Sequence, residues 1–316
     1  AYEIVQGDWS SDVCSADLAV HANGALCPVF HGGLNEEGKP MDMIWQTTRF
    51  DLDVSRPLVM GIVNVTPDSF SDGGSHADTS SALQHAQRLL EEGAAILDVG
   101  GESTRPGAEV VPADLELARL VPILKELVRW NVPISVDTYK PQVMQAVLDL
   151  GVDIINDIWA LRQSGAEAVV ASHPRCGVCL MHMHGEPQTM QTLPMQGSSI
   201  QPVVEFLQHH AQALQAMGVA QERIALDPGV GFGKTVAQNF ELLAHQDQLL
   251  ALPYPLLVGW SRKSSIGAVT GCEVGGRMVP SVAAAVLAVE RGARIVRVHD
   301  VAQTVYALKV WQAAQV

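Results

Sequence analysis

The sequence predicts an α/β protein with a (β/α)8 barrel, also called a TIM barrel, and three observations lead to this prediction. Short apolar runs rich in β-branched residues alternate with segments whose apolar residues recur at helical spacing. The runs are apolar throughout, as expected for parallel strands that are buried on both faces. Eight such pairs span about 260 residues, which is close to the usual length of this barrel and favours it over an open doubly wound sheet.

The predicted elements follow one another in a regular order. Strands are expected at residues 58–63, 95–99, 133–136, 153–155, 178–181, 223–226, 255–258 and 294–298. Helices are expected at residues 80–92, 113–130, 141–150, 165–172, 203–217, 237–250, 281–291 and 301–312. Pro141 suits the first turn of a helix. Four helices are followed directly by a glycine that is expected to end them, namely Gly93, Gly151, Gly218 and Gly292.

Residues 1–42 lack the periodicity of the rest of the chain. The segment 8–18 reads like the translation of a sequencing-adapter oligonucleotide with one change. We therefore expect a disordered leader that is wholly or partly an assembly artefact, with the natural start at Met41 or Met43. A native extension is the alternative. Residues 43–316 are expected to form a single barrel domain.

Composition excludes several classes of protein. The net charge of −14 argues against a general nucleic-acid binder, which needs a basic face. There is no run of about 18 apolar residues, so no membrane span is predicted. The five cysteines are too scattered for a disulfide framework, and Cys176 and Cys179 are interpreted as reduced core thiols rather than a metal or redox pair. The expected location is the cytoplasm.

Polar side chains follow every predicted strand. Carboxyl-terminal strand ends of a barrel meet at one mouth, where active sites lie. Helix capping alone would call for Ser, Thr, Asn or Asp, whereas Arg, Lys and His recur here. The residues are Asn64; Asp98 and Arg105; Asp137 to Lys140; Asn156 and Asp157; His182 and His184; Asp227; Ser261 to Lys263; and Arg297, His299 and Asp300.

These strand-end residues divide into two chemical groups. The donors, which suit a polyanion such as diphosphate, are Arg105, Arg262, Lys263, Arg297 and His299, with Asn64 as a neutral donor. Asp137 and Asp227 supply acceptors and Asn156 an amide, which suit the edge of a heterocycle that presents N–H groups beside a carbonyl. The sequence therefore predicts a ligand with a flat polar ring at one end and phosphates at the other.

Two other patterns carry less information. The glycine-rich run 229–235 fails as a phosphate-binding P-loop because Pro228 stands where that motif needs glycine. It is interpreted as a loop whose backbone approaches a ligand closely. His182 and His184 could be metal ligands, but no third ligand lies at a useful spacing, so they are interpreted as histidines of the site wall.

Together, the strand-end motifs resemble those of the dihydropteroate synthases. The resemblance covers residues 57–312 and includes a motif at every strand end, in order. The motifs are Asn64-Val-Thr-Pro-Asp-Ser-Phe-Ser-Asp-Gly-Gly74, Asp98-Val-Gly-Gly-Glu-Ser-Thr-Arg-Pro-Gly107, Ser135-Val-Asp-Thr138, Ile155-Asn-Asp157, Leu180-Met-His-Met183, Leu226-Asp-Pro-Gly229 with Gly231-Phe-Gly-Lys234, Ser261-Arg-Lys-Ser264 and Arg297-Val-His-Asp300.

The resemblance implies a pterin-binding barrel domain and a reaction of folate biosynthesis. In this reaction 6-hydroxymethyl-7,8-dihydropterin diphosphate condenses with 4-aminobenzoate to give 7,8-dihydropteroate and diphosphate, by an SN1-like path with Mg²⁺. It also implies two mobile loops at residues 65–75 and 102–109, a homodimer, and sensitivity to sulfonamides.

The resemblance further implies roles for individual residues. Asp137, Asn156, Asp227 and Lys263 would hold the pterin. Asn64, Arg297 and His299 would hold the diphosphate, with Mg²⁺ coordinated through Asn64. These three residues and Lys263 would be the catalytic residues. The 4-aminobenzoate site would be formed by Phe70, Thr104, Arg105, Pro106 and Ser264.

Two alternatives remain beside this reading. A pterin-binding methyltransferase domain of the corrinoid type shares the barrel and the acidic pterin site, but needs neither a diphosphate site nor the Ser261–Ser264 run. A non-catalytic homologue would bind the pterin without turning it over. Release of diphosphate distinguishes a synthase from both.

Overall fold

The computed structural model describes residues 43–65, 75–103, 110–185, 190 and 194–315. Within these residues eight parallel strands form one sheet, in the order β8-β7-β6-β5-β4-β3-β10-β9. The strands are β3 (Leu58–Asn64), β4 (Ile96–Gly100), β5 (Ile134–Asp137), β6 (Ile154–Asp157), β7 (Gly177–Met181), β8 (Ile224–Asp227), β9 (Leu257–Val258) and β10 (Ile295–Val298).

The two edge strands of this sheet meet, so the sheet closes into a barrel. A parallel bridge joins Leu226 of β8 to Leu256, just before β9, and the Leu226 N–H donates to the Pro255 carbonyl at 3.0 Å. Closure leaves no long exposed edge on which another strand could pair. The predicted (β/α)8 barrel is therefore confirmed.

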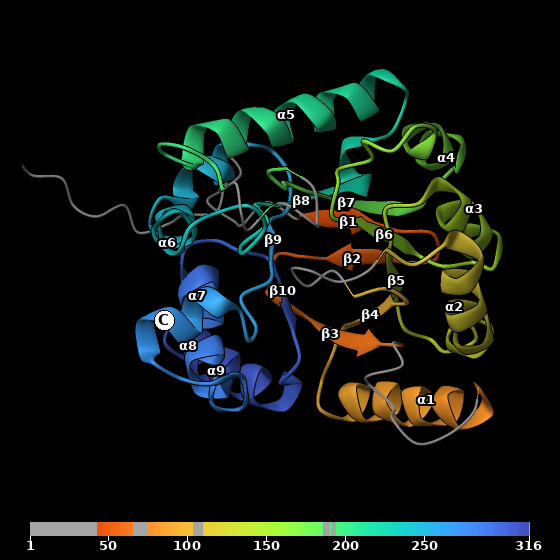
Figure 1. The fold of residues 1–316 in the computed structure, drawn as a ribbon, viewed down its shortest axis with the longest axis horizontal. Helices are drawn as coiled ribbons and strands as arrows, with labels where there is room; N and C mark the ends of the chain where they lie inside the picture. The colour runs from red at the N-terminus through yellow and green to blue at the C-terminus, as the bar shows by residue number, and fades with distance from the viewer. Residues whose placement is uncertain (1–42, 66–74, 104–109, 186–189, 191–193, 316) are drawn as a thin grey trace, which may run out of the picture. The chain divides into compact units, whose positions relative to one another are not determined.

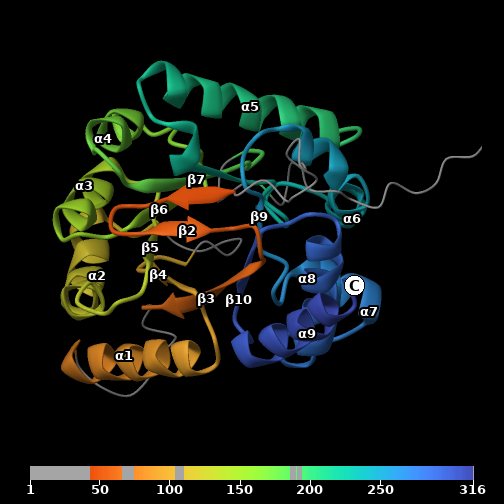
Figure 2. The ribbon, with the colours of Figure 1, turned by 180° about the vertical axis from the view of Figure 1, so that it is seen from behind.

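Helices surround the barrel, and each strand leads into at least one of them (Figure 1 and, from behind, Figure 2). They are α1 (Ser75–Glu91), α2 (Ala113–Leu127), α3 (Pro141–Asp149), α4 (Ala166–Ser172), α5 (Ile200–Ala216), α6 (Val236–Ala244), α7 (Ser264–Thr270), α8 (Met278–Glu290) and α9 (Val301–Ala313). None of the described helices combines the length and apolar composition needed to cross a membrane.

Side chains alternate between the two faces of each strand, and this alternation separates two cores. Outward-facing residues such as Val59, Val63 and Val136 pack beneath the helices. Inward-facing residues near the strand starts, including Met60 and Ile295, form a smaller apolar cluster inside the barrel.

A hairpin covers the end of the barrel where the strands begin. It consists of β1 (Ile44–Gln46) and β2 (Asp51–Asp53), which pair antiparallel. Its Trp45 is fully buried and packs in the cluster that contains Met60 and Ile295. The indole N–H donates to the Arg223 carbonyl at 3.1 Å, which satisfies the one polar atom of that side chain. This end of the barrel is therefore closed by apolar packing.

The structure corrects several predicted boundaries. The hairpin and α7 were not predicted, and the predicted helix 237–250 is α6 followed by a separate 3₁₀ helix at Gln246–Ala251. Helix α1 begins at Ser75, five residues before its predicted start. The predicted glycine stops are confirmed, because all four have positive φ values. Pro141 begins α3 as expected.

Candidate active site

The inside of the barrel is apolar near the strand starts and polar in its carboxyl-terminal half. The same alternation that points Met60 and Ile295 inward also points inward polar residues nearer the strand ends, namely Asn64 on β3 and Arg297 on β10. Asp98 is fully buried, and Asp137, Asn156 and Asp227 are between 5% and 7% exposed. These four residues, all among the strand-end residues noted in the sequence, thus lie together at the mouth.

Arg297 connects two of the strands across the mouth. Its Nε donates to Asp98 at 2.6 Å and its Nη2 donates to Asp137 at 2.8 Å. Both carboxylates raise the pKa of the guanidinium against the opposing effect of burial. Sequence reasoning assigned Arg297 to the diphosphate and gave Asp98 no role. In the structure the guanidinium is bound to Asp98 and Asp137, and its side chain is 21% exposed.

Asp137 has an acceptor that no described residue uses. Its Oδ1 is buried without a hydrogen-bond partner among the described residues, as is the Ser135 hydroxyl two residues earlier. Burial, opposed by Arg297 and reinforced by Asp98, raises the pKa of Asp137 to about 7. An unsatisfied buried acceptor costs about 1–3 kcal/mol, so the geometry suits a ligand that donates an N–H here.

Asp227 and Lys263 form the opposite side of the acidic group. The Gly229 N–H donates to Asp227 Oδ1 at 2.7 Å, and burial raises the pKa of Asp227 to about 6. The Lys263 ammonium lies 4.2 Å from the centre of the Phe232 ring, which offers a flat apolar wall. Burial and then the charge of Arg297 lower the pKa of Lys263 to about 8.

The glycine-rich loop packs closely against another loop of the protein. A Cβ at Gly229 or Gly233 would lie 1.9 Å or 2.3 Å from a carbonyl oxygen of the loop after β7, so these glycines allow two loops of the protein to touch. Lys234 is buried, and its ammonium donates to three main-chain carbonyls, including that of Gly229 at 2.9 Å. The side chain therefore stabilises the loop from within rather than pointing into the site.

His299 is held by Ser261 close to the positively charged side chains of Arg297 and Arg262. The Ser261 Oγ lies 2.9 Å from His299 Nδ1 and also accepts the His299 main-chain N–H at 3.1 Å. Burial, with Arg297 and Arg262 nearby, lowers the pKa of His299 to about 3, so the free ring is neutral near pH 7. Arg262 itself has a φ of 59°, an uncommon conformation that is typical of functional turns, and it pairs with Asp300 at 2.6 Å.

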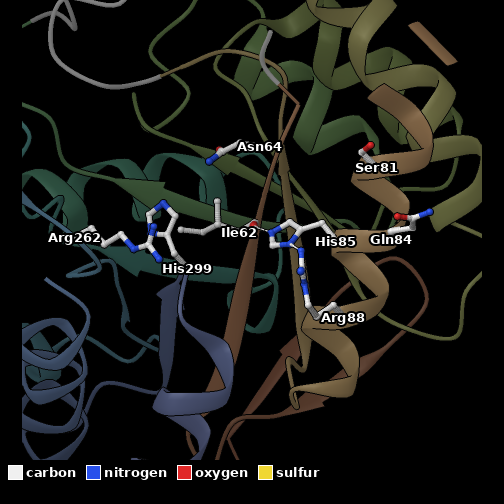
Figure 3. Close-up of a pocket in the computed structure, with 8 residues that line it drawn as sticks. All are labelled: Ile62, Asn64, Ser81, Gln84, His85, Arg88, Arg262 and His299. Atoms are coloured by element: carbon white, nitrogen blue, oxygen red, sulfur yellow. Dashed lines mark hydrogen bonds between the residues drawn. The ribbon is translucent and has the colours of Figure 1, made fainter. Parts of the chain in front are cut away.

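A cavity of about 500 Å³ opens beside these residues (Figure 3). Asn64, Arg262 and His299 line it from the strand ends, and Ile62 lies between them and α1. Helix α1 contributes residues that sequence reasoning missed, namely Ser81, Gln84, His85 and Arg88. Their spacing of three and four residues places them on one helix face, and this polar stripe was the signal that could have identified them.

A second ionic cluster is formed by Lys140, Glu102 and Glu116, and the sequence did not predict that these residues meet. The Lys140 ammonium contacts the Glu102 carboxylate and lies 2.5 Å from Glu116 Oε2. Glu102 accepts hydrogen bonds from the Tyr139 hydroxyl and the Val111 N–H, both at 3.2 Å. Glu116 is fully buried on α2, and burial raises its pKa. An acid in a first helical turn reads from sequence as an exposed cap, which explains the omission.

Several predicted residues are not brought into the described site. Phe70, Thr104, Arg105 and Pro106 lie outside the described residues, and so does the leader 1–42. Ser264 is described and is the exposed first residue of α7.

The sequence predicts His182 and His184 as histidines of the site wall. His182 is buried against the edge of the Phe206 ring, and burial lowers its pKa to about 2. No group of three or more His, Cys, Asp or Glu side chains suited to a metal occurs among the described residues.

Known proteins share both the fold and the sequence of this barrel. Residues 60–299 match the family of pterin binding enzymes. Dihydropteroate synthase of Neisseria meningitidis serogroup C is 50% identical over 274 residues, covering 85% of this chain and 97% of that protein. The structure of Xanthomonas albilineans dihydropteroate synthase with 4-aminobenzoic acid is 48% identical with a TM-score of 0.81, covering 86% of this chain and 98% of that one.

A Burkholderia cenocepacia dihydropteroate synthase complexed with 7,8-dihydropteroate is 49% identical with a TM-score of 0.78, covering 86% of this chain and 96% of that one. The chain therefore belongs to the dihydropteroate synthases, which are transferases.

Proposed function

We propose that this enzyme condenses 6-hydroxymethyl-7,8-dihydropterin diphosphate with 4-aminobenzoate to give 7,8-dihydropteroate and diphosphate. One observation carries the proposal: a group of buried acceptors and a cavity lined by cationic donors lie side by side at one barrel mouth. The relatives with bound 4-aminobenzoic acid and 7,8-dihydropteroate support the same chemistry.

The acidic group suits the pterin ring. A pterin edge presents N–H donors beside a carbonyl, and Asp137 Oδ1 is a buried acceptor without a described partner. Asp227 supplies a second carboxylate, and Asn156 supplies an amide whose hydrogen bonds to Asp98 are long, at 3.3 and 3.4 Å. Such N–H donors stabilise the ionised carboxylates, so bound ligand lowers the pKa values that burial has raised.

The cavity suits the diphosphate. Asn64, Arg262 and His299 line it, and none of the described residues in its lining is a carboxylate. Arg297 lies between the two halves, bound to Asp98 and Asp137. In this position the guanidinium holds the acidic side chains that contact the ring and adds positive charge near the breaking bond.

The cavity also fits a magnesium ion that arrives with the substrate. Mg²⁺ is commonly bound by one or two protein oxygens together with substrate phosphates. Asn64 offers one neutral amide oxygen, and the described residues hold no cluster of acids that would bind the ion by themselves. When bound, Mg²⁺ would neutralise negative charge on the diphosphate.

The residues support an SN1-like path. The bond between the pterin methylene carbon and the diphosphate oxygen breaks first, and diphosphate leaves with the electron pair. Asp137 and Asp227 stabilise the cation that remains on the pterin, while His299 and Arg297 stabilise the leaving group. The neutral amine of 4-aminobenzoate then attacks the carbon and loses a proton to water, so no strong base is needed.

The second substrate is assigned by resemblance to Phe70, Thr104, Arg105, Pro106 and Ser264. Of these, Ser264 lies next to Lys263 and is exposed at the mouth side of α7. We extend the proposal to inhibition by sulfonamides, which imitate 4-aminobenzoate. Growth of a complemented strain that is unaffected by sulfonamide would contradict this part.

An apolar surface on the carboxyl-terminal helices supports a homodimer as part of the proposal. Val279 of α8 is 69% exposed, and Tyr306 and Val310 of α9 are 65% and 72% exposed. Apolar residues gathered on exposed helices commonly mark an interface between subunits. Sedimentation equilibrium that finds only monomer at micromolar concentration would refute the dimer. Cytoplasmic location remains part of the same proposal.

The decisive test is release of diphosphate from the pterin diphosphate with Mg²⁺, measured with and without 4-aminobenzoate. Release that depends on 4-aminobenzoate and yields 7,8-dihydropteroate supports the synthase. Tight binding of the pterin without release would instead indicate a binding-only homologue.

A further inference from the structure

We propose that Ser261 is a positioning residue, whose hydroxyl sets the tautomer of His299 so that Nε2–H is presented to the diphosphate. The proposal rests on the proposed function, because it assigns a role within the same anion site. Ser261 was noted in the sequence only as part of a strand-end run.

Ser261 lies beside a gap at the end of strand β10. This strand pairs with β3 as far as Val298 and Gly61, and with β9 as far as Val296 and Val258. Beyond these pairs, side chains bind two main-chain groups. The Ile62 carbonyl bonds to His85 Nε2 at 3.2 Å, and the His299 N–H donates to Ser261 Oγ at 3.1 Å. The cavity opens at this gap (Figure 3).

The hydroxyl has only one proton, and its two contacts with His299 determine where that proton points. The main-chain N–H of His299 occupies a lone pair of the Ser261 oxygen. If Nδ1–H donated to the second lone pair, at 2.9 Å, the hydroxyl proton would have no acceptor among the described residues, whereas donation from the hydroxyl to Nδ1 uses that proton. Nδ1 is consequently an acceptor, and the ring proton lies on Nε2.

The tautomer matters because the ring is neutral. A charged imidazolium donates from both nitrogens, whereas a neutral ring donates from one only. Burial and the nearby cations Arg297 and Arg262 keep His299 uncharged in the free enzyme near pH 7. With the proton on Nε2 the ring donates to a phosphate oxygen, whereas with the proton on Nδ1 it would present a lone pair to an anion.

Ser261 is itself held firmly. It is 7% exposed and lies at the start of the turn in which Arg262 has a φ of 59°. The Arg262 N–H donates to the Ser281 hydroxyl at 2.8 Å, and its side chain pairs with Asp300, the residue after His299. Both ends of the turn are therefore fastened to α8 and to the end of β10, which leaves the Ser261 hydroxyl little freedom to move.

The test compares Ser261→Ala, Ser261→Thr and Ser281→Ala. Ser281→Ala removes a hydroxyl that fastens the same turn without touching His299, so it measures loosening of the turn alone. The readout is the tautomer of His299 in the free enzyme, from ¹⁵N chemical shifts of the ring, together with kcat/KM for the pterin diphosphate. Measuring the tautomer requires no turnover, so it tests the role of Ser261 even if the enzyme does not catalyse the proposed reaction.

We expect Ser261→Ala to shift His299 away from the pure Nε2–H form and to lower kcat/KM about tenfold, which corresponds to about 1.4 kcal/mol. Ser261→Thr keeps the hydroxyl and should retain the tautomer and the activity within about twofold. Ser281→Ala should leave the tautomer unchanged. An unchanged Nε2–H signal in Ser261→Ala would overturn the proposal.

A double-mutant cycle tests whether Ser261 acts through His299. In a His299→Ala background Ser261→Ala should cause no further loss of kcat/KM, because the group that it orients is gone. A full additional tenfold loss in that background would also overturn the proposal. A third outcome separates the two proposals. If neither the wild-type protein nor any variant makes 7,8-dihydropteroate, but Ser261→Ala still shifts the tautomer as expected, the proposed function is wrong and the effect of Ser261 on the tautomer is supported.

Discussion

The two ends of the barrel are built by one rule and yet have opposite properties. At both ends every second residue of a strand points inward. At the closed end these residues are apolar, and Trp45 of the hairpin covers them. At the mouth they are Asp98, Asp137 and Arg297, held by charge-assisted hydrogen bonds. The closed end is complete without a ligand, whereas the mouth keeps at least one buried acceptor unpaired within the described residues.

This difference indicates where substitutions should affect stability and where they should affect catalysis. A dry apolar end contributes free energy of folding and tolerates no loss of volume. An end with buried charges contributes less net stability but orients a ligand. The predictions below test that separation, from the largest expected effect to the smallest.

Trp45→Ala should lower the free energy of unfolding by about 3–5 kcal/mol, because it removes a large buried side chain and leaves a cavity. The kcat of the protein that remains folded should change less than about threefold, since the hairpin lies at the far end of the barrel from the mouth. Denaturant unfolding and steady-state rates check both parts. Trp45→Phe is the matched control, as it keeps most of the volume and loses the bond to the Arg223 carbonyl.

Arg297→Ala should lower kcat/KM by about 10²–10³, the usual cost of losing a preorganised charge near a breaking bond. It also leaves Asp98 and Asp137 buried without their cation, so we expect a lower melting temperature as well. The double variant with Asp137→Asn should recover part of the stability but none of the activity. Wild-type turnover in Arg297→Ala would contradict the assignment of the mouth as the catalytic site.

Asp227→Asn should change the pH dependence of stability. The pKa of Asp227 is about 6 in the folded protein, above the ordinary carboxyl value, because of burial. A raised carboxyl pKa contributes stability that is complete below the unfolded pKa of about 4 and is lost as the pH rises through about 6. Wild-type protein should therefore lose up to about 3 kcal/mol from this group between pH 4 and pH 7.

In Asp227→Asn that part of the pH dependence should disappear, while binding of the pterin diphosphate weakens. Thermal unfolding across pH 4–8 gives the measurement. Because Asp137 and Asp157 also have pKa values raised to about 7 by burial, a slope from those groups should persist in the variant. A slope identical to that of the wild type would contradict the assignment to Asp227.

Arg88→Ala should have the smallest effect, raising the KM for the pterin diphosphate about twofold to threefold. Arg88 lines the cavity from α1, and its Nη2 donates to His85 Nδ1 at 3.0 Å, but the side chain is exposed and water screens it. The KM for 4-aminobenzoate should not change. Arg129→Ala is the matched control, because Arg129 is an exposed arginine after α2 that pairs with Glu126.

Much of the fold could be read from the sequence because the strands are uniformly apolar. A parallel strand buried on both faces is a continuous apolar run, which can be recognised from its own residues. The polar residues at the strand ends were equally visible, and the structure brings Asp137, Asn156 and Asp227 together at one mouth. The hairpin was missed because two three-residue strands have almost no local signal and gain their stability from packing on the barrel.

The sequence by itself determined the order of the eight barrel strands, most of the helices around them and the polar residues at the strand ends. These depend on local periodicity, which each segment carries on its own. Only the tertiary structure decided which groups are partners: Arg297 with Asp98 and Asp137, Lys234 with loop carbonyls, Ser261 with His299. Such pairs join residues far apart in the chain, and closure of the barrel brings them within hydrogen-bonding distance.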